Sequence, residues 1–574
     1  MIDPRYDTLQ VLFADRVFRI PPYQRFYSWQ PKQREDLFSD LIKLANRPGD
    51  QHHFMATIVC HKTSEIMPIG TAQYRLYDVV DGQQRLTTLI LLMKCIELAL
   101  PEGSDDRKDL GRILVKRDGH LILLQTNNAN AHIFNRFIRE GTRPTGAEIQ
   151  IYSDRNLASA IQGCIKFLHK WNETRDTLSL MRLILHRLGF VVYDTEDTRV
   201  VYTLFEVLNS RGLTVDWLDK AKSVLMGKAY ELGESHMAQQ AEIEALQKIW
   251  SQIYSELAKE DIPGDEILRI AATLHYGPGQ GKPRPAEESL ELLRRECKSP
   301  NNPTQISERL LAVAQKLSSL YANVQLGAVT DILQARLLAV AILSAQGVND
   351  VERGKLLEQW ERVTFRIFGL FGKDARTKVG DYVKIGYRIV TNHIDTRTYN
   401  QIMAALHELG SEYPVGKAVE DGVVEKDFYE SPDACRYLLW NYEEHLATKQ
   451  GSAATVDELE RSAIWKERAS DSIEHVFPQS PGSEPGWVGK MRGEDGVEKV
   501  IQHNVGRIGN LLLLPTALNS EAQVRSFDEK KKIYEKHSLR MIKEISSEQD
   551  WTLASIERRE GTITAWAKTR WADL

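Results

Sequence analysis

The sequence predicts an α+β protein that is predominantly helical and built from several domains. The chain has 574 residues, more than the roughly 250–300 that a single hydrophobic core organises. Short β-rich segments occur only in its N-terminal part, and helical spacing of apolar residues covers most of 287–446. The composition, 42% hydrophobic and 27% charged, is that of a globular protein with enough apolar side chains for several cores.

The N-terminal part is predicted to be an α+β module. We expect strands at the β-branched or apolar stretches 17–20 (VFRI), 57–60 (TIVC) and 75–80 (RLYDVV), and a long apolar helix from about Leu86 to Leu100. The third strand runs directly into Asp81-Gly82-Gln83-Gln84-Arg85. This turn therefore joins a strand to a helix N-terminus, where backbone amides and the helix dipole favour an anion.

The remaining chain is predicted to be mainly helical up to a polar hinge. Amphipathic spacing covers about 156–232, interrupted by the apolar run 189–197 and by a turn at 209–212. The Gly- and Pro-rich stretch 276–285 is predicted to be a loop, and 380–390 a break in the helical region that follows. Residues 449–456 (KQGSAATV) are small and polar, typical of a hinge before the last domain.

Charge and cysteine usage limit the function classes. The formal net charge of −5 excludes a uniformly basic protein that coats DNA, so any nucleic-acid contact must be local. Five scattered cysteines without CxxC spacing fit a reducing compartment better than a disulfide scaffold. We expect a cytoplasmic protein with no membrane segment.

The C-terminal part carries the residue types that phosphodiester hydrolysis requires. His475 is a candidate base because an imidazole titrates near neutral pH. Glu474 and Asn519 are candidate oxygen ligands for Mg²⁺ or Mn²⁺, and Asn510 is expected to orient the imidazole. Taken singly, each could equally be an ordinary strand-end histidine or turn asparagine.

These residues occur in an order that resembles HNH, or ββα-metal, nucleases. The pattern EHxxP, then GNLxLL, then Asn over about 471–534 is similar to the subtype found in the GmrSD and SspE families of restriction endonucleases. The resemblance implies DNA as a partner. Basic residues that could hold DNA, or simply form a solvated face, are Lys490, Arg492, Arg507, Arg525, Lys530, Lys531 and Lys532.

Two N-terminal segments combine glycine, arginine and aromatic residues. Residues 20–29 set Tyr23, Gln24 and Arg25 beside a proline pair and further aromatics, which suits phosphate binding and base stacking. The turn from Asp81 to Arg85 offers a close backbone approach, an arginine and a carboxylate. The structural alternatives are an aromatic cluster around a turn and a capped strand-to-helix junction.

Both segments resemble motifs of the ParB-like N-terminal module of the GmrSD family, and 205–212, with Asp219 and Lys222 after it, resembles a third. The resemblance implies binding and hydrolysis of a nucleoside triphosphate, with GTP favoured, and a neighbouring phosphate- or modification-sensing pocket at Tyr23, Gln24 and Arg25. It places the nucleotide on Asp81, Gly82, Gln83, Gln84, Arg85, Asn209 and Arg211.

This resemblance divides the chain into a ParB-like domain at 1–235, a helical linker region at 236–448 and an HNH nuclease domain at 449–574. It implies a modification-dependent anti-phage endonuclease that responds to phosphorothioate DNA, as SspE does, or to glucosylated hydroxymethylcytosine, as GmrSD does. A single HNH site cuts one strand, so double-strand cleavage requires a homodimer or repeated nicking. The alternatives are a nucleotide-switched ParB-like DNA-binding protein and an RNA-targeting toxin nuclease.

Overall fold

The computed structural model forms two compact units. It describes residues 4–14, 16–47, 52–69, 72–116, 121–126, 131–197, 200, 201, 204, 216–233, 235–323, 332–449, 464, 465, 468–481, 487 and 504–573. The first unit comprises Met1–Ala272 and Arg284–Ser318, and the second Thr273–Pro283 and Ser319–Leu574. The linker region predicted at 236–448 is thus divided between the units, because its first helices pack with the N-terminal part and its later ones with the C-terminal part.

A mixed six-stranded sheet organises the N-terminal unit. Its strand order is β1-β8-β3-β4-β2-β7, formed by β1 (Arg5–Thr8), β8 (Leu188–Thr195), β3 (His53–Ile69), β4 (Ala72–Asp81), β2 (Arg16–Ile20) and β7 (Leu124–Thr126). Strands β4, β2 and β7 are parallel, so their carboxyl ends lie at the same edge of the sheet. The strands predicted at 17–20, 57–60 and 75–80 are confirmed as parts of β2, β3 and β4.

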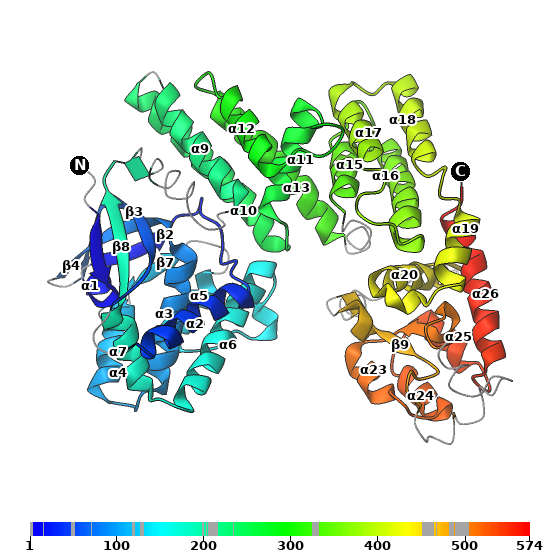
Figure 1. Ribbon diagram of the computed structural model, residues 1–574, viewed down its shortest axis with the longest axis horizontal. Coiled ribbons are helices and arrows are strands. Elements are labelled where there is room, and N and C mark those ends of the chain that lie inside the picture. The colour runs from blue at the N-terminus through cyan, green and yellow to red at the C-terminus, as the bar shows by residue number, and fades with distance from the viewer. Residues whose placement is uncertain are drawn as a thin grey trace. The chain divides into compact units, whose positions relative to one another are not determined.

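Helices cover one face of this sheet and bury its apolar side chains. They are α1 (Leu9–Ala14), α2 (Pro31–Ala45), α3 (Gln83–Ala99), α4 (Asp105–Leu114), α5 (Ala131–Glu140), α6 (Tyr152–Asn172) and α7 (Thr177–Arg187). Figure 1 shows α2, α3, α5 and α6 gathered beside the sheet. The predicted apolar helix is confirmed as α3, which is buried almost all round and therefore forms the centre of the core. The two-residue strands β5 (Val115–Lys116) and β6 (Leu121–Ile122) form a separate hairpin.

The remaining part of the first unit and the first part of the second unit are helical. Helices α9 (Trp217–Leu232), α10 (His236–Lys259) and α12 (Ala286–Glu296) belong to the first unit, whereas α11 (Gly264–Tyr276) and α13 (Asn302–Ala322) run across the boundary. The second unit continues with α15 (Leu333–Leu343), α16 (Asp350–Thr364), the π-helical turn η2 (Phe365–Leu370), α17 (Val379–Thr391) and α18 (Thr396–Leu409). The break predicted at 380–390 is wrong, because this segment is the interior of α17, whose apolar face is buried.

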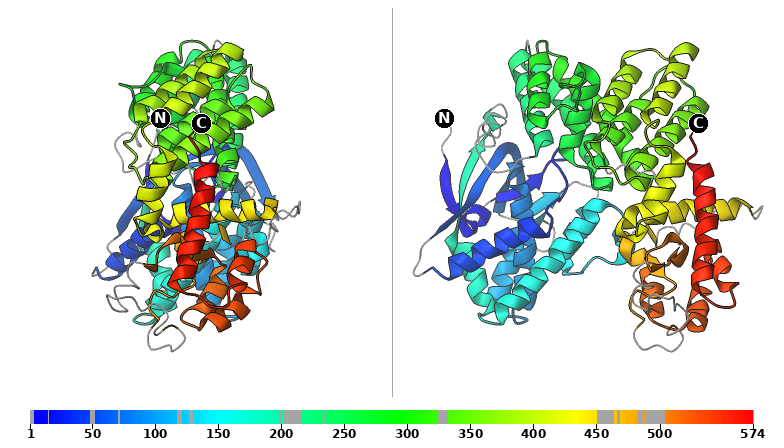
Figure 2. Two further views of the ribbon diagram at one scale, coloured as in Figure 1. Left: turned by 90° about the vertical axis from the view of Figure 1, so that its right-hand side faces the viewer. Right: turned by 45° about the vertical axis from the view of Figure 1, so that its right-hand side comes forward.

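The C-terminal part of the second unit consists of helices and a two-stranded hairpin around a hydrophobic core. It contains α19 (Val415–Val419), η3 (Glu420–Val424), η4 (Phe428–Glu430), α20 (Pro432–Lys449), η5 (Ala469–Ser472), β9 (Ile473–His475), η6 (Ile508–Asn510), β10 (Leu511–Leu513), α23 (Thr516–Ala522), α24 (Phe527–Tyr534), α25 (Arg540–Ser546) and α26 (Leu553–Arg570). Figure 2 shows α26, in red, running along this part. The predicted hinge at 449–456 lies outside the described residues, apart from Lys449. None of the described helices is long and apolar enough to cross a membrane.

Candidate functional site

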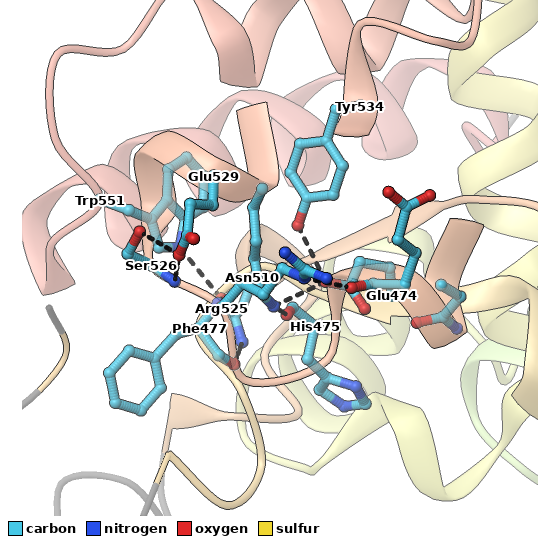
Figure 3. A network of polar contacts seen from close by, with 12 residues as sticks. Glu474, His475, Phe477, Asn510, Arg525, Ser526, Glu529, Tyr534 and Trp551 are labelled. Carbon is cyan, nitrogen blue, oxygen red and sulfur yellow. Dashed lines mark hydrogen bonds and ion pairs between the residues drawn. The ribbon is translucent and has the colours of Figure 1, made fainter. Parts of the chain in front are cut away.

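The C-terminal motif folds into a short antiparallel hairpin. Strand β9 pairs with β10 so that His475 lies opposite Leu511 and Glu474 opposite Leu512. Both strands are buried, because the leucines of β10 join the core that α20 and α26 cover. Neighbouring side chains in a strand point to opposite faces, so Glu474 and His475 face different surroundings. Figure 3 shows the imidazole pointing away from the carboxylate of Glu474.

His475 is a buried, uncharged imidazole. His475 is 7% exposed, and its Nε2 atom is buried without a hydrogen-bond partner among the described residues. The ring of Tyr429, from η4, packs edge-on against it with 4.4 Å between ring centroids. Burial, followed by the positive charge of Lys530, lowers the pKa of His475 to about 3. The imidazole is therefore neutral at physiological pH, which is the form a general base requires.

Asn510 holds the chain beside the imidazole rather than the imidazole itself. Its Oδ1 accepts hydrogen bonds from Phe477 N at 2.8 Å and Trp551 Nε1 at 3.1 Å. Its Nδ2 donates to the carbonyl oxygens of Phe477 and Val505, both at 2.9 Å. These bonds use both donors and both lone pairs of the amide. The predicted contact between Asn510 and the imidazole is therefore corrected: Asn510 fixes the loop that follows His475.

The turn that carries Asn510 is supported by α26. Arg559 Nη1 donates to the carbonyl oxygens of Gly509 at 2.9 Å and Leu511 at 2.7 Å. A Cβ atom at Gly509 would lie 2.1 Å from the carbonyl oxygen of Ile556, so only glycine allows this close packing. Arg559 was not among the predicted site residues, because a lone arginine on a C-terminal helix carries no signal of the carbonyl groups to which it will donate.

Glu474 is paired inside the protein. Its Oε1 accepts hydrogen bonds from Lys530 Nζ at 2.7 Å and from the hydroxyl of Tyr534 at 2.9 Å. Burial raises the pKa of the Glu474 carboxyl, and the Lys530 charge opposes that effect. Glu474 Oε1 is thus committed to Lys530 and Tyr534, and the role of Glu474 as a metal ligand stays a prediction. The same pairing removes Lys530 from the predicted DNA-binding face, because the ammonium group is fully buried.

Asn519 lies on α23 and bonds to the strand that carries the base. Its Nδ2 donates to the carbonyl oxygens of Asp471 at 2.9 Å and Ile473 at 3.1 Å. Among the described residues there is no group of three or more His, Cys, Asp or Glu side chains that could hold a metal ion. Glu474 is therefore not part of such a group among the described residues, and the metal ligands Glu474 and Asn519 stay predictions.

Of the other basic residues predicted near the nuclease motif, one is paired with a carboxylate and two lie outside the described residues. Arg507 Nε donates to Glu560 Oε2 at 3.0 Å, so its charge is neutralised on α26. Lys490 and Arg492 lie outside the described residues.

The N-terminal turn is a strand-to-helix junction, as its sequence predicts, and its glycine has a left-handed backbone conformation. Strand β4 ends at Asp81, and Gly82, with φ of 90°, precedes the first residue of α3. A Cβ atom at Gly82 would lie 3.3 Å from Ile58 Cγ1 and 3.4 Å from the carbonyl oxygen of Thr57. Both the backbone angle and the close neighbours favour glycine.

Charged groups of this turn are withdrawn from bulk water. Burial raises the pKa of Asp81, while the amide of Gly82 and the charge of Arg85 oppose that effect. Burial lowers the pKa of Arg85, whose guanidinium lies 5.8 Å from the ring centroid of Trp29. The pair thus combines a desolvated carboxylate and a desolvated guanidinium at the N-terminus of α3, where an anion is favoured.

The two glutamines of the turn differ. Gln84 hydrogen-bonds to the segment 20–29. Its Oε1 accepts from Ser28 N at 2.9 Å, and its Nε2 donates to the carbonyl oxygen of Phe26 at 3.0 Å. The expected nucleotide contact of Gln84 is therefore replaced by a structural one. Gln83 Oε1 is buried and has no hydrogen-bond partner among the described residues, so it keeps an acceptor for a ligand.

The segment 20–29 is bonded to α9 through the side chains of Gln24 and Arg25. Gln24 Nε2 donates to the carbonyl oxygen of Val80 at 3.1 Å, and Gln24 Oε1 accepts from Lys222 Nζ at 2.8 Å. Arg25 pairs with Asp219, Nε to Oδ2 at 3.3 Å, and its Nη1 lies 3.8 Å from Asp216 Oδ2.

Two of the three residues of the predicted sensing pocket are buried, and the sensing role stays a prediction. Tyr23 and Gln24 are 8% and 2% exposed, so both lie inside the protein rather than on a DNA-facing surface. Arg25 is the most exposed residue of the three, and it also lines a recess with Thr126, whose hydroxyl oxygen is buried without a partner among the described residues. Asn209 and Arg211 lie outside the described residues.

Comparison with protein families identifies both ends of the chain. The N-terminal domain of the GmrSD restriction endonuclease matches residues 9–226, and the C-terminal domain of GmrSD restriction endonucleases matches residues 413–566. The fold and the two matches define the protein as a restriction endonuclease, which acts on DNA. Within that class, the chain belongs to the GmrSD family, because it carries both domains in one polypeptide. A search of curated proteins found no match.

Proposed function

We propose that this chain is a modification-dependent anti-phage DNA endonuclease of the HNH type, in which nucleoside triphosphate hydrolysis in the N-terminal unit regulates cutting at His475. The observation that carries the proposal is the state of His475: a neutral imidazole whose Nε2 has no hydrogen-bond partner among the described residues. A neutral imidazole with a free lone pair can accept a proton from the attacking water.

The burial of His475 Nε2 supports the proposed regulation. Nε2 is buried and the ring of Tyr429 packs against the imidazole, so water and DNA must gain access before the base acts. An endonuclease that cuts only after such a change is held inactive on host DNA. A nucleotide-driven change is one physical source for this opening, provided that the nucleotide binds the two states with different affinity.

The proposed nucleotide site is the turn at Asp81, Gly82, Gln83 and Arg85. The N-terminus of α3 and the guanidinium of Arg85 favour phosphate, and Gln83 Oε1, which has no hydrogen-bond partner in the described part of the chain, offers an acceptor. Arg25 also lies close enough to affect this site, because burial raises the pKa of the Asp81 carboxyl and the positive charge of Arg25 opposes that rise. GTP is the triphosphate we expect from the family resemblance.

Cutting is proposed to require Mg²⁺ or Mn²⁺, which would stabilise the charge that develops on the phosphate. The described residues do not complete a site for this ion. The structure therefore supports the role of His475 as the base and the role of Asn510 in holding the loop beside it, and the metal site rests on the proposal alone. A cytoplasmic protein that acts as a homodimer or by repeated nicking fits this activity.

The test is a plasmid assay with purified full-length protein. Supercoiled plasmids that are unmodified, phosphorothioate-modified or glucosylated at hydroxymethylcytosine are incubated with Mg²⁺, with and without GTP or ATP, beside a His475→Ala control. Nucleotide-dependent nicking or cleavage of one modified plasmid, lost in the control, supports the proposal. Equal cutting of all plasmids without nucleotide contradicts regulation. Hydrolysis without any DNA cutting favours the DNA-binding switch, and cutting of RNA alone favours the toxin nuclease.

A further inference from the structure

The residue that precedes the base belongs to a buried polar cluster on the opposite face of β9. Lys530 Nζ lies 2.7 Å from Glu474 Oε1 and 2.7 Å from the carbonyl oxygen of His475. The hydroxyl of Tyr534 donates to the same Oε1 at 2.9 Å. A single ammonium group thus bonds both to the side chain of one strand residue and to the main chain of the next.

The helix α24 supplies both partners in the required geometry. Lys530 and Tyr534 are four residues apart, so they lie on the same face of the helix and reach the same carboxylate. Side-chain exposure is 0% for Lys530 and 4% for Glu474, so the ion pair is shielded from water. A shielded pair is sensitive to loss of one partner, because the other is left as an unpaired buried charge.

The same geometry opposes a metal ion on Glu474. Its Oε1 already accepts from a cation and a hydroxyl, and a divalent ion bound to this carboxylate would lie next to the buried ammonium group of Lys530. Like charges at such a separation in a shielded interior repel strongly. Moving Lys530 away would also release the carbonyl oxygen of His475, which the lysine holds.

We infer that Glu474, Lys530 and Tyr534 form a positioning triad that holds the strand carrying His475, and that Glu474 affects DNA cutting through this triad rather than as a metal ligand. The inference rests on the proposed role of His475 as the base. Lys530 acts through the main chain of His475, and Glu474 and Tyr534 fix Lys530 in turn. None of the three touches DNA in this role.

The test compares Glu474→Gln, Lys530→Met and the double variant Glu474→Gln/Lys530→Met in the full-length protein. Gln keeps an acceptor for Tyr534, and the double variant carries no buried charge. Lys543→Met, on the exposed side of α25, is the matched control for loss of a lysine. Each single variant is expected to melt at a lower temperature than the wild type, and the double variant to recover most of the difference, because the charge left by each single change is then removed.

The nicking rate and its dependence on Mn²⁺ separate positioning from ligation. The double variant is expected to nick at least about tenfold faster than Lys530→Met. Its half-saturating Mn²⁺ concentration is expected to stay within about twofold of the wild-type value, since no ligand has been lost. Lys530→Arg, which keeps a charged donor, is expected to retain more activity than Lys530→Met.

A double variant that folds with the wild-type melting temperature but nicks no faster than His475→Ala overturns the inference. So does a Mn²⁺ affinity that is at least about tenfold lower in the folded double variant than in Lys530→Met, measured without DNA by the paramagnetic signal of free Mn²⁺. The melting and Mn²⁺ measurements need no DNA cutting. If the wild type fails to nick any plasmid, the proposed function fails, while these two measurements still decide the role of Glu474.

Discussion

The side chain of Asn510 and the main chain of Phe477 form a reciprocal hydrogen-bonded pair. Phe477 N donates to Asn510 Oδ1 at 2.8 Å, and Asn510 Nδ2 donates back to the carbonyl oxygen of Phe477 at 2.9 Å. The pair ties the chain just after His475 to the turn before β10. The position of the base therefore depends on Asn510, although the two side chains have different partners.

Asn510→Ala is expected to lower stability and cutting together. The change leaves Phe477 N, Trp551 Nε1 and two carbonyl oxygens without partners in a buried region, which costs about 2–4 kcal/mol of unfolding free energy. Thermal unfolding and plasmid nicking measure the two effects, with Asn392→Ala, an exposed asparagine of the same unit, as the control. A variant with unchanged melting temperature but no cutting would show instead that Asn510 contacts the imidazole or DNA.

The rate of DNA cutting is expected to resist acid, provided that the opening that admits water and DNA leaves most of the imidazole packed in the protein. The active base is the neutral imidazole, and burial, followed by the charge of Lys530, lowers the pKa of His475 to about 3. Protonation therefore removes the base only as the pH falls through this low value. Single-turnover nicking at saturating metal should change by less than about threefold between pH 8 and pH 5.5 on account of this group. An acid limb centred near 6.5 would show that the imidazole is solvated in the active state.

The same pKa shift affects stability. The unfolded chain, with an ordinary histidine pKa of 6.5, binds a proton at His475 that the folded chain does not bind until about pH 3. Stability is therefore full above pH 6.5 and falls as the pH drops through this window. The His475→Ala variant should lose less stability between pH 7 and pH 5 than the wild type, as measured by thermal unfolding.

Gly82→Ala is expected to impair the nucleotide site and leave the nuclease part folded. The left-handed φ of 90° costs a residue with a Cβ atom about 1–2 kcal/mol, and the new methyl group would press on Ile58. Triphosphate hydrolysis should fall. Gly146→Ala is the matched control, because its Cβ meets open space and its φ is not positive. Unchanged hydrolysis in a folded Gly82→Ala variant would place the nucleotide elsewhere.

Sequence alone predicted the elements whose signals are local. The long apolar run predicts α3, and the strand that runs into Asp81-Gly82 predicts the strand-to-helix junction. Partners from distant segments were not predictable. Lys530 and Trp551 reach Glu474 and Asn510 from helices and loops far along the chain, and nothing in the spacing of the motif indicates them.

The errors have physical reasons. Glycine and β-branched residues at 380–390 favoured a break, but burial of an apolar face against neighbouring helices outweighs these local preferences in α17. Gln24 and Gln84 resembled ligand-binding residues because amides bind phosphates and bases, yet an amide serves equally well to join two segments of backbone.

Arg85→Ala is expected to lower triphosphate hydrolysis and the nucleotide-dependent part of cutting. The guanidinium is the cation closest in sequence to the helix N-terminus that favours phosphate, and it is only partly exposed. Hydrolysis is measured by phosphate release, and the melting temperature of the variant confirms its fold. Full nucleotide dependence in a folded variant would contradict the proposed site.

The most direct test of the account measures hydrolysis and DNA cutting in the same reaction for the wild type and His475→Ala. His475→Ala is expected to lose cutting by at least about a hundredfold, since a general base contributes on that scale, while triphosphate hydrolysis continues at the wild-type rate. Cutting that persists in His475→Ala, or hydrolysis that disappears with it in a folded protein, would contradict the division between a regulatory N-terminal site and a cutting C-terminal one.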